Sequence, residues 1–225
     1  MDALFSRIAR RYDRMNRIMS LSLDSRWRRA ALESCRIPEG VRALDLACGT
    51  GDFTMEILRR DADALVTAID ITGEMIEIAK GKLSGRPGVR FVVADACDLG
   101  MFGDRSFDLV TCAFGFRNFH DRERALAECF RVLSPGGELA VLEFFRPGSW
   151  IAGAAVGAWL RAVSFAFAHG ARREYACLRR SISGMVDADG FAAEARDAGF
   201  AEIRRRRLLP AATAIVFEKP VSARA

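Results

Sequence analysis

Short apolar runs alternate with amphipathic stretches through the middle of the chain. Runs of four to eight apolar residues between turn residues are typical of buried β-strands. Such runs occupy residues 42–47, 65–70, 89–94, 107–113 and 138–145, and residues 203–209 and 214–218 are expected to form a closing strand pair after them. We therefore expect seven strands.

The segments between these runs carry apolar residues at every third or fourth position, which predicts helices. The expected helices cover residues 53–58, 75–83, 122–133 and 187–198. A turn at 134–137, Ser-Pro-Gly-Gly, is expected to close the third of them. Strands that alternate with helices in this way predict an α/β fold with a mostly parallel sheet and helices on both faces.

Three further segments stand apart from this alternation. Residues 1–36 read as a basic helix with one apolar face. Residues 151–168 are apolar but are interrupted by Arg161, and they fall short of the roughly 20 residues of a membrane span. Four consecutive arginines, 204–207, lie in an expected strand, where alternation sends them to opposite faces, so we expect a solvated edge rather than one basic patch.

The composition narrows the class of protein without identifying a function. With 225 residues, 51% hydrophobic and 28% charged, the chain is typical of a soluble globular protein of one domain. The net charge of +5 is compatible with acidic partners or an anionic membrane surface. Six scattered cysteines and two histidines predict reduced thiols, no disulfide and no metal site. The N-terminus lacks the apolar core of a signal peptide, so we expect a cytoplasmic protein.

A glycine-containing turn follows the first apolar run, in the stretch Asp45-Leu-Ala-Cys-Gly-Thr-Gly-Asp52. In open α/β sheets ligands bind where such a loop leaves the carboxyl end of a strand, and Gly49 and Gly51 allow a close backbone approach. Asp70, at the end of the second run, is spaced to hold ribose hydroxyls. The third glycine of a dinucleotide motif is missing, which favours a cofactor without pyrophosphate. A glycine turn that binds nothing is the alternative.

This stretch resembles the first motif of S-adenosylmethionine-dependent methyltransferases of the Rossmann-like class. Further stretches resemble the menaquinone and ubiquinone C-methyltransferase family, over roughly residues 4 to 147. They are Tyr12-Asp-Arg-Met-Asn16, Met19-Ser-Leu21, Trp27-Arg-Arg29, Phe114-Gly-Phe-Arg-Asn-Phe119, Pro135-Gly-Gly137 and Val141-Leu-Glu-Phe-Phe-Arg-Pro147. The chain departs from the family pattern at 22–24, at 99–102 and at Ala113, which leaves the quinone head group open.

The resemblance implies a Rossmann-like, seven-stranded, mostly parallel sheet in a single methyltransferase domain over residues 1–225. Its expected parts are a helical N-terminal cap (1–40), a cofactor-binding core (41–147), a helical lid insertion (148–183) and a closing helix with a strand pair (184–225). The implied cofactor is S-adenosyl-L-methionine, and the residues implied to bind it are Asp45, Gly49, Thr50, Gly51, Asp70, Asp95 and Ala96. Asp95 would accept a hydrogen bond from the adenine amine, although an aspartate that only caps a turn is the alternative.

Two residues of the 114–119 motif are the candidate catalytic residues. Arg117 can stabilise a developing phenolate, and Asn118 can orient that oxygen or a water. Alternatively, Arg117 forms a salt bridge with a helix carboxylate such as Glu123. Tyr12 and Tyr175 are weaker candidates for contact with the head group, and no residue is an obvious dedicated base.

The implied reaction is methyl transfer to a ring carbon of a prenylated quinol, most simply demethylmenaquinol to menaquinol. A benzoquinol of the ubiquinone pathway and another small molecule are the alternatives. A non-enzymatic assembly partner is disfavoured because Asp70 and Asp95 are present. A nucleic-acid methyltransferase is disfavoured because no base-flipping motif follows the fourth strand. Contact with a peripheral membrane surface and a homodimer remain open.

Overall fold

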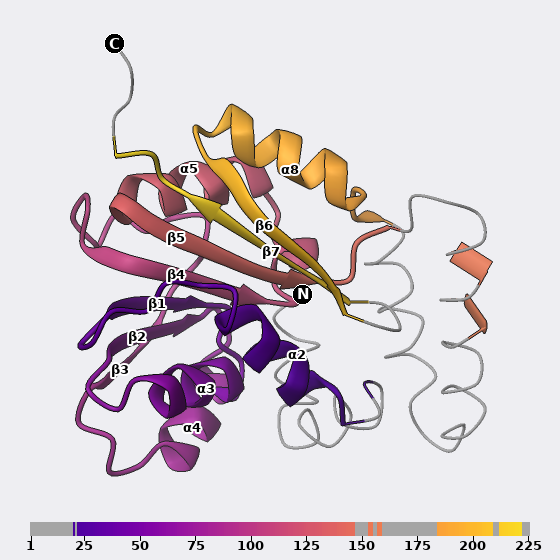
Figure 1. The fold of residues 1–225 in the computed structure, drawn as a ribbon. Helices are drawn as coiled ribbons and strands as arrows, with labels where there is room; N and C mark the ends of the chain where they lie inside the picture. Colours follow the sequence, from indigo (N-terminus) through magenta and orange to yellow (C-terminus); the bar gives the residue numbers. More distant parts are fainter. Residues whose placement is uncertain are drawn as a thin grey trace.

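Seven strands form one sheet in the order β3-β2-β1-β4-β5-β7-β6 (Figure 1). The structure, a computed structural model, describes residues 20, 22–146, 153–154, 157–158, 184–208 and 212–221. The strands are β1 (Arg42–Leu46), β2 (Leu65–Asp70), β3 (Val89–Val93), β4 (Phe107–Ala113), β5 (Leu133–Glu143), β6 (Ala201–Leu208) and β7 (Ala212–Glu218). The first five run parallel, and β7 is antiparallel to both of its neighbours. The predicted seven-stranded, mostly parallel sheet is confirmed.

Helices cover both faces of this sheet, as Figure 1 shows. The helices are α2 (Asp24–Leu32), α3 (Asp52–Arg60), α4 (Gly73–Lys82), α5 (Arg122–Val132) and α8 (Ala188–Asp197), with a short 3₁₀ helix η1 (Phe116–Asn118) after β4. Alternation along β1 sends Leu44 and Leu46 into the core that contains the apolar residues of α5 and α8. Ala43, which precedes Leu44 and so points to the other face, packs in the second core with residues of α2 and α3.

The start of β5 differs from the sequence prediction. We expected residues 134–137 to form a turn and the strand to begin at Glu138, but the strand begins at Leu133. Leu133 pairs with Phe107 and Glu138 pairs with Leu109, so four residues bulge out opposite the single residue Asp108. Gly136 adopts a φ of +77° in this bulge. The turn-forming residues do bend the chain locally. Leu133, before the bend, pairs with Phe107 of β4, and this contact with a distant strand cannot be predicted from the residues around the bend.

The other boundaries lie close to those predicted. β2 and β4 have the expected ends, and the ends of α3, α4, α5 and α8 differ from the predicted ones by at most two residues. Asp121 and Asp187 cap α5 and α8, since their side chains accept hydrogen bonds from Arg124 N and Gly190 N. The expected alternation of the arginines is also seen. Arg204 donates to the Ser34 carbonyl beside α2, whereas the next residue, Arg205, pairs with Asp189 of α8.

Part of the expected N-terminal helix and most of the lid insertion lie outside the described residues. These segments include Tyr12, Tyr175 and nearly all of the apolar stretch 151–168. The described portion of the N-terminal segment contains α2, which packs beside α3. None of the helices in the described part of the chain combines the length and the apolar character that a bilayer-spanning helix needs.

Candidate active site

A cavity of about 350 Å³ opens at the carboxyl ends of the parallel strands. Its walls come from the segments that follow β1, β2, β3 and β4, together with Met75 of α4. Five of the residues predicted for the site line it: Gly49, Asp70, Asp95, Ala96 and Asn118. The remaining four, Asp45, Thr50, Gly51 and Arg117, do not line it. The fold therefore brings together the ends of separate strands, as expected for a ligand site of an open α/β sheet.

Asp70 joins the first two of these strand ends. Its Oδ2 accepts a hydrogen bond from Gly49 N at 2.9 Å, and its Oδ1 accepts one from Thr72 N at 2.9 Å. Each carboxylate oxygen has two lone pairs, so a carboxylate can accept more than two hydrogen bonds. The carboxylate is thus held rigidly by the backbone while it faces the cavity, and such an acceptor suits a ribose diol.

Asp45 lies behind the glycine loop and is only 1% exposed. Its carboxylate accepts hydrogen bonds from Thr54 Oγ1 of α3 at 2.6 Å and from Thr111 Oγ1 of β4 at 2.8 Å. Burial raises the pKa of Asp45 to about 6, against the opposing effect of these two hydrogen bonds. The structure therefore gives Asp45 the role of tying β1, α3 and β4 together beneath the loop.

Gly51 and Thr50 connect the glycine loop to α4. Gly51 has a φ of +83°, and a Cβ there would lie 2.9 Å from Leu83 Cδ1 and 3.3 Å from Ala79 Cβ. A glycine is therefore required both by the backbone conformation and by the close approach of α3 to α4. Thr50 Oγ1 accepts a hydrogen bond from Lys82 Nζ at 3.1 Å. These contacts tie the glycine loop to α4 and to Leu83 at its end.

Two non-glycine residues of the cavity wall have left-handed backbones. The φ of Ala47 is +49° and that of Phe114 is +59°. Such angles are uncommon for residues with a Cβ, and they concentrate at functional sites. Between them lies Gly115, where a Cβ would be 2.6 Å from Cys112 Sγ and 2.9 Å from Ala47 Cβ. The ends of β1 and β4 are thus packed against each other at the floor of the cavity.

Arg117 forms a buried ion pair with Glu143, the last residue of β5. Its Nη1 lies 2.5 Å from Glu143 Oε1, and the two side chains are 9% and 0% exposed. The alternative of a salt bridge to a helix carboxylate such as Glu123 is wrong as to the partner, because β4 pairs with β5 and the ends of these strands place Glu143 beside η1. Glu143 Oε1 also accepts from Phe144 N at 2.7 Å. Sequence reasoning missed this carboxylate, although its position at the end of a strand was a signal.

The Arg117 guanidinium lies against two aromatic rings. Its carbon Cζ is 5.6 Å from the ring centroid of Phe114 and 5.7 Å from that of Phe144, and these two rings stack on each other. Its Nε is buried without a hydrogen-bond partner among the described residues. The charge is therefore located directly behind Phe114, which lines the cavity.

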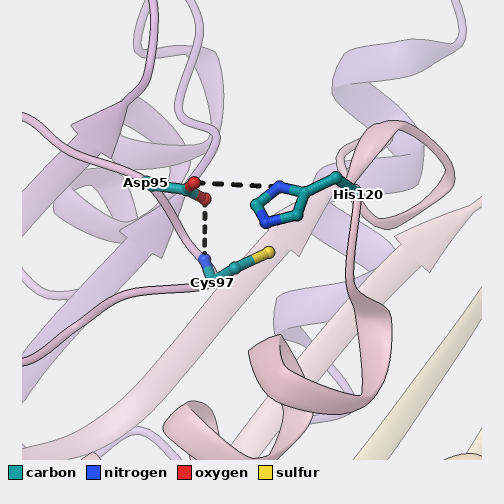
Figure 2. A group of neighbouring side chains, drawn as sticks. All are labelled: Asp95, Cys97 and His120. Carbon is teal, nitrogen blue, oxygen red and sulfur yellow. Dashed lines mark hydrogen bonds and ion pairs between the residues drawn. The ribbon is translucent and has the colours of Figure 1, made fainter.

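Asp95, Cys97 and His120 gather at the end of the cavity beyond β3, and Figure 2 shows their side chains converging. His120 Nδ1 lies 3.7 Å from Asp95 Oδ2, while Asp95 Oδ1 accepts a hydrogen bond from Cys97 N at 2.8 Å. The ligand atoms lie within 4.8 Å of one another, a spacing that a metal ion could bridge. However, burial raises the pKa of Cys97 to about 11, and its Sγ donates to the Asp121 carbonyl. The thiol is thus engaged by the backbone, while Asp95 and His120 of this cluster line the cavity.

The sequence that forms this site matches a known protein family. A model of the ubiE/COQ5 methyltransferase family matches residues 1–218. The chain belongs to the ubiE/COQ5 methyltransferase family. This places the glycine loop, the two cavity aspartates and the segment 114–119 within one family pattern, as the sequence resemblance implied.

Curated relatives of this family member include demethylmenaquinone methyltransferases from two bacteria. The one from Thermus thermophilus is 49% identical over 145 residues, which cover 64% of this chain and 66% of the relative. The one from Deinococcus radiodurans is 45% identical over 152 residues, or 67% of this chain and 63% of the relative. A ubiquinone/menaquinone biosynthesis C-methyltransferase of Geobacter sulfurreducens is 42% identical over 149 residues, which cover 65% of this chain and 58% of the relative. These alignments thus span less than two thirds of each relative.

Solved structures support the fold of this family member. A putative methyltransferase of Haloferax volcanii, in complex with the Trm112 activator, has a TM-score of 0.70 at 19% identity, covering 96% of this chain and 97% of that chain. A possible histamine N-methyltransferase of Thermotoga maritima has a TM-score of 0.68 at 20% identity. The match covers 97% of this chain and 100% of that chain. The chain therefore has the Rossmann-like fold of class I methyltransferases.

Proposed function

We propose that the protein is an S-adenosylmethionine-dependent C-methyltransferase that methylates the ring of a prenylated quinol, converting demethylmenaquinol to menaquinol. One observation carries the proposal: in a ubiE/COQ5 family member, the glycine loop, Asp70 and Asp95 meet in a single cavity. The names of the relatives from Thermus and Deinococcus favour the naphthoquinol over a benzoquinol.

The cavity residues suit the nucleoside part of the cofactor. In this proposal Asp70 accepts hydrogen bonds from the ribose hydroxyls, and Asp95 accepts one from the adenine amine. Both carboxylates are already oriented by backbone N–H groups, those of Gly49 and Cys97. Preorganised acceptors of this kind favour binding because little ordering is left to occur. When bound, the cofactor supplies a methyl group on a positively charged sulfur, which makes that methyl electrophilic.

The segment after β4 would hold the quinol. Phe114 and Phe119 give the cavity an aromatic wall against which a planar ring can stack, and Asn118 provides a polar group on the same wall. The Asn118 Nδ2 donates to the Phe114 carbonyl at 3.3 Å, which fixes the orientation of the amide. The Asn118 amide would then orient the ring hydroxyl or a water, so that the ring carbon faces the methyl group.

Arg117 would stabilise the charge that develops on the quinol. The quinol hydroxyl would give its proton to water, which raises the electron density of the ortho carbon. That carbon would take the methyl group as the bond between the methyl group and the cofactor sulfur breaks, and its own proton would then leave to water and restore the aromatic ring. The positive charge of the guanidinium, which lies behind Phe114, would lower the energy of that anion. Glu143 would keep the guanidinium in this position through their ion pair.

The direct test is to incubate the purified protein with the cofactor and demethylmenaquinol under reducing conditions and to analyse the quinone by mass spectrometry. The expected result is a product heavier by one methylene, formed only when both substrates are present. A demethylated benzoquinol is assayed in parallel, and methylation of it alone would assign the protein to the alternative head group. Absence of methylation of both quinols by a protein that binds the cofactor would contradict the proposal.

A prenylated quinol resides in the bilayer, so the protein would meet it at the membrane surface. We propose peripheral contact of the protein with an anionic membrane. The net charge of +5 supports this proposal, since each Lys or Arg near an anionic surface contributes about 1 kcal/mol.

A further inference from the structure

A second cavity, of about 550 Å³, lies between α2, α3 and the end of α4. Its walls are strongly polar and carry charges of both signs. They comprise Ser22, Asp24, Ser25, Arg28, Asp52, Met55, Glu56, Arg59 and Lys82. Its three cations pair with its three anions: Arg28 with Asp24, Lys82 with Asp52, and Arg59 with Glu56, each at 2.6 Å.

Arg28 is the most buried cation of this cavity. Its side chain is 7% exposed, and its Nη1 forms an ion pair with Asp24 Oδ2 at 2.6 Å. Asp24 is held in turn by Ser20 Oγ at 3.0 Å. The Arg28 Nε, however, is buried without a hydrogen-bond partner among the described residues. Buried polar groups are nearly always hydrogen-bonded, so an orphaned donor on a positioned cation points to an acceptor that binds there.

The position of Arg28 links the two cavities. Its guanidinium carbon lies 5.8 Å from the ring centroid of Phe114, which lines the first cavity. Its Nη2 lies 4.0 Å from Asp52 Oδ2, and Asp52 directly follows the glycine loop at the start of α3. Figure 1 shows α2, which carries Arg28, lying beside α3. The guanidinium is therefore between the glycine loop and the segment after β4.

We propose that Arg28 anchors a subsite for the amino-acid end of S-adenosylmethionine. The α-carboxylate would accept hydrogen bonds from Arg28, and the α-ammonium would pair with Asp52. The inference rests on the proposed function, because it requires the nucleoside of the same cofactor to lie in the first cavity. A guanidinium presents parallel N–H donors that match the two oxygens of a carboxylate, which a lysine cannot do.

The test compares two ligands that differ only at the amino-acid end. S-adenosylhomocysteine carries the end that Arg28 would bind, whereas 5′-methylthioadenosine lacks it. Calorimetry on the wild-type protein should show tighter binding of S-adenosylhomocysteine. Arg28→Gln should weaken that binding roughly 10- to 100-fold, the effect of losing charge-assisted hydrogen bonds, and should leave methylthioadenosine binding unchanged. Unchanged methylthioadenosine binding also shows that the variant is folded.

Matched variants separate this role from a purely structural one. Arg29→Gln removes the neighbouring arginine, which is 62% exposed, and should change neither affinity. Arg28→Lys keeps a charge for Asp24 but loses the paired donors, so it should weaken S-adenosylhomocysteine selectively even if Arg28→Gln does not fold. Equal losses for both ligands, or no loss for either, would overturn the inference. Equal affinity of the wild-type protein for the two ligands would also overturn it. If the wild-type protein bound neither ligand, that result would contradict the proposed function instead.

Discussion

Asp70 and Gly49 are joined across two parallel strands by a hydrogen bond of 2.9 Å from the Gly49 N–H to Asp70 Oδ2. The bond connects the glycine loop after β1 to the last residue of β2, at the rim of the cavity. Asp70 thus has two tasks that can be separated experimentally. It shapes the loop, and in the proposed function it also holds the cofactor ribose.

Replacing Asp70 with alanine should weaken cofactor binding. The variant loses a charged acceptor of the ribose hydroxyls and the brace of the loop, so we expect a loss of about 1.5–3 kcal/mol in binding free energy. Isothermal titration calorimetry with S-adenosylhomocysteine measures this loss in binding free energy. Asp63→Ala removes an exposed aspartate before β2 and serves as the control, with unchanged affinity expected. Unaltered affinity in a folded Asp70→Ala protein would rule out the ribose assignment.

Removing Arg117 should impair turnover more than cofactor binding. Loss of one preorganised charge stabiliser typically lowers the rate by about 10²–10³-fold. The structure adds a second expectation, because Arg117→Ala leaves Glu143 as a buried, unpaired charge, which costs about 3–5 kcal/mol of folding stability. Rates are therefore to be measured at a temperature where the variant is folded.

A double variant distinguishes catalysis from structure at this ion pair. Arg117→Met with Glu143→Leu removes both charges, so folding stability should recover while turnover stays low. Thermal unfolding and steady-state kinetics provide the two measurements. Recovery of turnover together with stability would show that the pair serves only the fold.

The buried Asp45 should make folding stability depend on pH between about 4 and 6. Its pKa is raised from 3.8 to about 6 in the folded protein, so the folded state binds more protons than the unfolded state in this interval. Stability is therefore lost as the pH rises from 3.8 to 6, by an amount on the order of 1–3 kcal/mol, and is constant above. Asp45→Asn cannot ionise, so its melting temperature should rise relative to wild type across this range. A difference that does not vary with pH would contradict the assignment.

Gly51 and Gly85 allow steric contact to be separated from backbone strain. Both have a φ above +80°, but a Cβ at Gly51 would meet Leu83, whereas one at Gly85 would meet nothing within 4 Å. Gly85→Ala should cost about 1 kcal/mol of stability from strain alone. Gly51→Ala should cost more and should also weaken cofactor binding, because the loop must move away from α4. Equal effects of the two substitutions on unfolding and binding would show that the contact with Leu83 is unimportant.

The proposed membrane contact predicts salt-sensitive binding to lipid. The protein should sediment with anionic liposomes at low ionic strength and be released at high ionic strength, since the attraction between its basic residues and the surface is screened. Liposomes of neutral lipid are the control and should retain little protein. Equal sedimentation with both lipids would indicate that charge does not drive the contact.

The sequence predicted the parts of the site that follow from strand order. Asp70 and Asp95 could be placed together because the carboxyl ends of parallel strands share one edge of a sheet. The partner of Arg117 could not be predicted, because it depends on the pairing of β4 with β5. The bulge at the start of β5 was missed for the same reason. Arg28 was recognised in a family motif, but its burial and its orphaned Nε follow from the packing of α2 on α3.

The arginines of β6 have a consequence for how molecules of this protein meet one another. Among the strands of the described residues, β6 is outermost, so one side of it offers backbone groups to which another strand could add. Residues 204–207 of that strand are all exposed arginines. A second copy approaching edge to edge would bring its own arginines against these, and the repulsion between them opposes pairing. This edge therefore resists growth into fibrils at the high local concentrations that a crowded cell imposes.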